Sequence, residues 1–169
     1  AWASQARLFA DRLAVAGDHA RAGERWDYED DAARRTLLGA MRWAAEHDAD
    51  LGAQLLTGVA ERYALAPTVA MLDGIRRVVV DHAIPGGWPT RPLAGAAVDL
   101  NYLDLELMDR VAAVALQRAT TDAERALGLW AVGFAAGYLG REREALDALG
   151  EAEQRFNAAG DQLMVGLTL

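Results

Sequence analysis

The sequence of 169 residues predicts an all-α protein built as an array of antiparallel helix hairpins. Most residues are good helix formers, and the one run of three β-branched residues is Val78–Val80. Apolar residues recur at three- and four-residue spacings, which is typical of helices with one buried face. Three of the four prolines lie in residues 85–92, so this Pro/Gly-rich segment is expected to be a loop. We therefore expect N-terminal hairpins in residues 1–84 and further hairpins in residues 93–169, within one continuous domain.

Capping residues and apolar periodicity place four helices in the N-terminal part. Asp30 or Asp31 is a suitable N-cap for the second helix. Pro67 suits the first turn of the fourth helix, because the backbone N–H that proline lacks has no partner there in any helix. The four helices are expected over residues 2–22, from Asp30 or Asp31 to about His47, over 50–65, and from 67 onward.

The C-terminal part is expected to be helical from residue 93, with one interruption near Asn101–Asp104. Thr120–Glu124 supplies an N-cap followed by an acid in the first turn of the next helix. That helix should end at Leu139–Gly140. Another should begin by Glu142 and close at Ala159–Asp161, before a last helix that is truncated at the C-terminus.

Residues 126–159 resemble the tetratricopeptide repeat, a helix–turn–helix unit of about 34 residues. Gly133 is expected to let the second helix of the hairpin approach closely, Gly140 to act as the C-cap in the turn, and Ala145 to keep the helix crossing tight. The resemblance implies a right-handed solenoid, in which neighbouring hairpins bury the faces of this one. The matching positions are Leu129, Val132, Gly133, Ala136, Gly140, Ala145, Leu149 and Ala152.

A second resemblance covers residues 31–169. Residues 31–47 are similar to the opening of the helical region in large actinobacterial transcriptional regulators, and residues 148–161 are similar to repeat boundaries in the same proteins. In that family, an ATP-dependent switch module of the signal-transduction ATPase class precedes tetratricopeptide-like repeats. The resemblance implies a bacterial sensor or scaffold segment, with the nucleotide-binding and DNA-binding modules outside this sequence.

The composition excludes several kinds of chemistry. The chain has no cysteine, which rules out a disulfide framework, a thiolate zinc site and a cysteine nucleophile. It has no lysine, so the phosphate-binding motif Gly-x-x-x-x-Gly-Lys is absent. Ser4 is the only serine, and the three histidines lack the spacing of a metal site. We therefore expect a protein that is not an enzyme and that has no catalytic residue, metal or cofactor.

The charge and hydropathy of the chain bear on its partners and its location. The net charge of −8 would repel the phosphate backbone of a nucleic acid. No apolar run approaches the roughly 18 residues of a membrane span, and no signal segment begins the sequence. We therefore expect a cytoplasmic segment that does not itself bind nucleic acid or a membrane.

The most promising binding surface is an aromatic stripe. Trp130, Phe134 and Tyr138 follow one another at four-residue spacing on one helix face, and Leu127 lies one turn earlier. The first helices of tetratricopeptide arrays line a concave groove, so the resemblance implies that these side chains contact a peptide or an apolar effector. The alternative is that the rings pack against an adjacent hairpin as part of the core.

We interpret the chain as a protein-interaction module of a bacterial transcriptional regulator, active in signal transduction. Its partner would be another protein, a neighbouring domain of the same parent chain, or a second copy in a homo-oligomer. Asp99, Asp104 and Glu106 could form an acidic rim that favours basic partner segments.

The alternative function is a small-molecule sensor. In that case an apolar effector pocket would lie between helices and be lined by Trp43, Tyr63 and Trp88.

Overall fold

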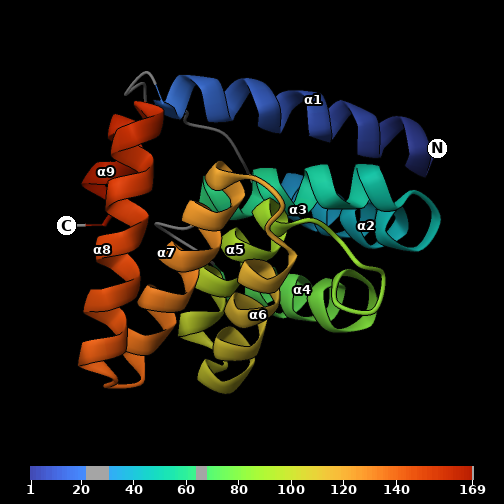
Figure 1. Cartoon of the computed structure of the whole chain (residues 1–169). Helices are drawn as coiled ribbons and strands as arrows, with labels where there is room; N and C mark the ends of the chain where they lie inside the picture. The colour runs from blue at the N-terminus through green and yellow to red at the C-terminus, as the bar shows by residue number, and fades with distance from the viewer. Residues whose placement is uncertain (22–30, 64–67, 169) are drawn as a thin grey trace. The chain divides into compact units, whose positions relative to one another are not determined.

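The computed structural model describes residues 1–21, 31–63 and 68–168, and these residues are helical, without a strand. The chain forms two compact units, Ala1–Trp88 and Pro89–Leu169, which divide within the segment predicted to be a loop. The helices of the first unit are α1 (Trp2–Arg21), α2 (Asp31–His47), α3 (Ala49–Tyr63), α4 (Val69–Val78) and η1 (Val79–Ala83). Those of the second unit are α5 (Thr90–Asp99), η2 (Leu100–Tyr102), α6 (Leu105–Arg118), α7 (Asp122–Tyr138), α8 (Glu142–Ala159) and α9 (Gln162–Gly166) (Figure 1).

In the first unit, α1, α2 and α3 pack against one another, and α4 and η1 pack against α2. Two glycines bring α1 close to its neighbours. A Cβ added to Gly58 of α3 would lie 2.6 Å from the Cβ of Leu13, and one added to Gly39 of α2 would lie 2.7 Å from the Trp2 ring. Each contact is closer than a residue with a side chain allows without displacing its neighbour. The largest fully buried side chains of this unit are Leu37, Met41, Leu55, Leu56, Met71 and Ile75.

The α4 helix continues directly into a π-helical turn. Thr68 caps the start of α4, where its hydroxyl accepts a hydrogen bond from the backbone N–H of Met71 at 3.3 Å. Pro67, which was expected in the first turn, lies outside the described residues. In η1 the backbone N–H of Ile84 donates to the carbonyl of Val79 at 2.9 Å, five residues back. Such turns are rare and are frequently found at functional sites. The apolar periodicity did not predict this one.

The first helix of the second unit, α5, begins three residues earlier than predicted, at Thr90 rather than residue 93. Pro89 occupies the N-cap of α5 and Pro92 lies in its first turn. Proline is compatible with this position because the N–H that it lacks would have no partner within the helix. The loop assigned to residues 85–92 is therefore shorter than expected, since two of its prolines belong to the start of a helix.

The predicted interruption between residues 93 and 119 is confirmed. The 3₁₀ turn η2 follows α5, and α6 begins after it. Asp104 is the N-cap of α6, where its carboxylate accepts the backbone N–H of Leu107 at 2.9 Å. The break redirects the chain, so that α6 packs against α5 as the second helix of a hairpin.

Both ends of α7 carry the caps that the sequence predicts. The hydroxyl of Thr121 accepts the backbone N–H of Glu124 at 3.2 Å, and the carboxylate of Glu124 accepts the backbone N–H of Thr121 at 3.1 Å. This reciprocal pair is a capping box. At the other end, Gly140 has a φ angle of +72°, and the N–H of Arg141 donates to the carbonyl of Ala136 at 2.9 Å. The left-handed glycine turns the chain from α7 into α8.

Two glycines let α7 pack closely on both of its neighbours, α6 and α8. A Cβ added to Gly128 would lie 2.6 Å from the Cα of Leu116 on α6. One added to Gly133 would lie 2.6 Å from the Cγ of Leu149 on α8 and 3.1 Å from its backbone nitrogen. The predicted role of Gly133 is confirmed. Ala145 is buried, and a Cβ added to Gly137 would lie 4.0 Å from the Cβ of Ala145. The packing of α7 against α6 and α8 therefore depends on having glycine, which has no side chain, at positions 128 and 133.

Substitution of either crossing glycine should destabilise the fold. We expect Gly128→Ala and Gly133→Ala each to lower the free energy of unfolding by about 2 kcal/mol, because the added methyl group would overlap a neighbouring helix. The loss should be larger for Gly128→Ala, whose methyl group would meet backbone atoms. Urea denaturation followed by circular dichroism measures both values.

Gly150→Ala is the matched control, because no atom lies within 4 Å of the added Cβ at this position inside α8. We expect it to raise the free energy of unfolding by about 0.5–1 kcal/mol, the usual gain from replacing a helical glycine. Equal effects at all three positions would contradict the role given to the helix crossings.

Candidate functional site

The aromatic stripe of α7 forms a continuous ladder of rings. The centroids of Trp130 and Phe134 lie 5.9 Å apart with their planes tilted by 41°, and those of Phe134 and Tyr138 lie 5.2 Å apart at 44°. These are favourable tilted ring contacts, so each ring fixes the orientation of the next. Leu127, one turn earlier, packs with Trp130 against the core formed by α7 and α8. The four residues that sequence reasoning selected thus lie along one helix.

Exposure is greatest at the C-terminal end of the stripe. Trp130 is half-buried, and its indole N–H donates to the carbonyl of Leu167 after α9 at 3.4 Å. Phe134 is also half-buried, whereas Tyr138 is 50% exposed. Leu163 and Leu167 of the α9 segment are exposed by about the same fraction. The stripe is therefore anchored at one end and open at the other, which combines a rigid orientation with accessible apolar surface.

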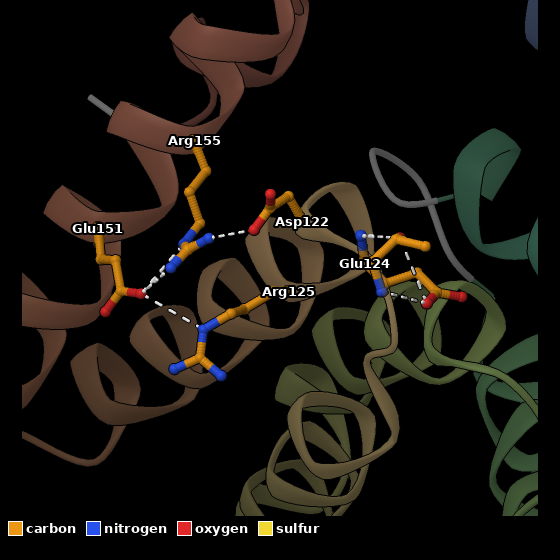
Figure 2. A network of polar contacts seen from close by, with 6 residues as sticks. Asp122, Glu124, Arg125, Glu151 and Arg155 are labelled. Carbon is orange, nitrogen blue, oxygen red and sulfur yellow. Dashed lines mark hydrogen bonds and ion pairs between the residues drawn. The ribbon is translucent and has the colours of Figure 1, made fainter.

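A polar network joins the start of α7 to the outer face of α8 (Figure 2). The guanidinium of Arg155 donates to Asp122 at 2.6 Å and to Glu151 at 2.9 Å, and Glu151 also accepts from Arg125 at 3.5 Å. The hydrogen bond from Arg155 lowers the pKa of Glu151. Each exposed ion pair contributes little stability by itself. Through these shared partners, Glu151 and Arg155 of α8 are linked to Asp122 and Arg125 of α7.

The first unit contains a groove of about 750 Å³ between α2 and α4–η1, and Trp2 of α1 also belongs to its lining. Trp43, one of the three residues assigned to the effector pocket from the sequence, lies in its wall. The groove does not match the apolar lining that was expected, because arginine and acidic side chains surround it. Its charged lining consists of Arg35, Arg42, Arg77, Glu46, Asp73 and Asp81.

The other two residues of the predicted effector pocket do not line this groove. Trp88 is buried, and its ring packs on α3 so closely that a Cβ on Gly52 would lie 2.7 Å from it. It fills the space beside α3 and belongs to the core of the first unit. Tyr63 is at the end of α3, and its side chain lies outside the described part.

Asp99 is buried and does not form part of an acidic rim, contrary to the sequence prediction. Asp99 is 1% exposed, and neither of its carboxylate oxygens has a hydrogen-bond partner among the residues that the structure describes. Burial raises the pKa of this carboxyl group from its ordinary value of 3.8 to about 7. Asp104 caps α6 and only Glu106 is freely exposed, so the predicted rim does not form.

Two features are absent from the described residues: a cluster of metal ligands and a helix that could cross a membrane. No group of three or more potential ligands is placed to hold a metal ion within residues 1–21, 31–63 and 68–168. Within the same ranges, no helix combines the length and the apolar character that a membrane crossing needs. No protein-family model matches the sequence, and comparisons with curated proteins and with solved structures reveal no significant similarity.

Sequence reasoning missed the arginines of the groove. Arg35 and Arg42 are seven residues apart on α2, a spacing that places both on the same helix face. That signal was present in the sequence, but charged residues at this spacing usually face solvent. The opposite wall comes from α4 and η1, so the groove becomes visible only once these helices are packed.

The buried carboxyl group of Asp99 predicts a pH-dependent stability. The unfolded chain releases this proton near pH 4, whereas the folded chain keeps it up to about pH 7. The free energy of unfolding should therefore fall as the pH rises through this interval, by about 4 kcal/mol in total, and level off above it. Asp99→Asn, which stays uncharged, should lack this fall.

Urea denaturation of both proteins between pH 5 and pH 8 tests this expectation. The difference in free energy of unfolding between Asp99→Asn and the wild type should grow in favour of the variant as the pH rises. Asp147→Asn, at an exposed position of α8, should follow the wild-type pH dependence. The same pH dependence in Asp99→Asn and the wild type would show that Asp99 does not titrate in this interval.

Proposed function

We propose that the second unit is a non-enzymatic protein-interaction module, and that the aromatic stripe of α7 binds an apolar face of a helical partner segment. The observation that carries the proposal is the ring ladder, held in place at Trp130 and half-exposed at Tyr138. Tyrosine and tryptophan that are held rigidly lose little conformational freedom on binding, and they are enriched at interaction hot spots.

The packing order of the helices supports a tetratricopeptide-like reading of the second unit. The α5 helix packs on α6 and α7, α6 packs on α7, and α7 packs on α8, which contacts α9. In a stack of helix hairpins, the first helix of each hairpin contacts both helices of the preceding one. In the same reading α5, α7 and α9 are first helices, and the stripe lies on the face that such arrays use for binding.

The charge of the chain favours a basic partner. A net charge of −8 attracts positively charged segments and accelerates their association. We propose a partner helix with an apolar face and flanking arginine or lysine residues, supplied by another protein or by a neighbouring domain of a bacterial transcriptional regulator. Apolar anchors four residues apart on that helix would match the spacing of the rings.

Selection of displayed peptides against the purified chain tests this function. We expect enrichment of amphipathic basic helices, and we expect Tyr138→Ala to weaken their binding by about tenfold or more, the equivalent of about 1.4 kcal/mol. Tyr138 is half-exposed and contacts Phe134, so the substitution should lower the free energy of unfolding by only about 1 kcal/mol and leave the protein folded. Affinities are measured by isothermal titration calorimetry with one selected peptide.

Leu146→Ala is the control, because this leucine is 73% exposed and belongs to α8 rather than to the stripe. The selected peptides should bind this variant as they bind the wild type. Peptides that bind Tyr138→Ala and the wild type equally, or a selection that enriches no amphipathic helix, would contradict the proposed function.

A further inference from the structure

The groove of the first unit has unpaired positive charges on one wall. Arg35 and Arg42 are exposed side chains of α2, and no carboxylate of the described residues lies within ion-pair distance of either. On the opposite wall, Asp73 accepts hydrogen bonds from Arg77 at 2.8 Å and lies 3.5 Å from Arg76. The charge of Asp73 is thus compensated within α4. The two guanidinium groups of α2 remain available to an anion from outside.

The same wall presents an indole ring in a fixed orientation. The ring of His47 stacks on that of Trp43 with centroids 4.8 Å apart and an angle of 8° between the planes. The Nδ1 of His47 donates to the carbonyl of Trp43 at 2.8 Å, which holds the imidazole in place. Trp43 lines the groove and His47 does not, so one ring supports the other from outside. A flat apolar ligand could pack beside Trp43 without reorganising it.

The acidic side chains restrict the charge of such a ligand. Glu46 and Asp81 also line the groove, and their carboxylates would repel a molecule with several negative charges. A volume of about 750 Å³ lies within the usual range for small-molecule sites. The π-helical turn η1 carries Asp81 and His82 into the lining, and such turns are commonly found at binding sites.

We propose that this groove binds an aromatic monocarboxylate, whose carboxylate pairs with Arg35 and Arg42 while its ring packs beside Trp43. The site lies in the first unit and shares no residue with the aromatic stripe of the second, so it does not rest on the proposed interaction function. The sequence predicted an apolar pocket, whereas the specificity of the proposed site comes from its charged side chains.

Three probes with the same ring system and different charges test the proposal: naphthoate, naphthamide and naphthylmethylamine. Isothermal titration calorimetry with the whole chain at neutral pH measures each affinity. We expect naphthoate to bind about tenfold or more tightly than the neutral amide, because only the carboxylate forms charged hydrogen bonds with guanidinium groups. The amine should bind most weakly, since it carries the charge of the arginines.

Substitutions show whether binding occurs in the groove. Arg35→Gln and Arg42→Gln should each weaken naphthoate binding by about tenfold and leave naphthamide binding nearly unchanged. Arg110→Gln on α6 changes the net charge equally at an exposed position outside the groove, and it should have no such effect. Circular dichroism of all three variants checks that they remain folded.

Each alternative result would overturn the proposal. No binding of naphthoate would show that the groove does not take an aromatic carboxylate. Tighter binding of the amine would show that the acidic side chains dominate, and equal effects of Arg35→Gln, Arg42→Gln and Arg110→Gln would show that binding reflects net charge only.

Discussion

The close contact of α7 with the helices on both of its sides is the constraint on which the second unit depends. Gly128 faces the backbone of α6 at Leu116, and Gly133 faces Leu149 of α8. Helices usually pack with their axes about 8–10 Å apart, and glycine at the crossing permits the short end of that range. Because α6 and α8 cover two faces of α7, only the rest of its surface can contact other molecules. The aromatic stripe lies on part of that surface.

The all-α class and most helix positions were predictable, because local signals coincide with the helix boundaries. The capping box at Thr121 and Glu124 and the left-handed turn at Gly140 are both encoded by adjacent residues. Apolar periodicity likewise locates the helices. The start of α5 was missed because proline was read as a helix breaker, whereas Pro92 lies in the first turn, where proline is tolerated. Gly128 was also overlooked, since its partner, the backbone of α6, is identified only in three dimensions.

The candidate sites were less predictable, because they depend on which side chains lose contact with water. The stripe could be predicted, as four-residue spacing on one helix is enough to bring Trp130, Phe134 and Tyr138 together. Asp99 illustrates the opposite case: an aspartate near a helix end normally faces solvent, yet tertiary packing buries this one without a partner. The sequence allowed Trp88 to be either a pocket wall or a core residue. Its packing on α3 makes it a core residue. Sequence patterns report which residues share a face, but they do not report what covers that face.

The most direct test of this account is a double-mutant cycle between Gly133 and Leu149. If the Cβ of residue 133 competes with the Leu149 side chain for the same space, Gly133→Ala should lower the free energy of unfolding much less in a Leu149→Ala background than in the wild type, with a coupling energy above about 1 kcal/mol. If the two substitutions are additive, α7 and α8 do not depend on this close contact, and the central claim is wrong.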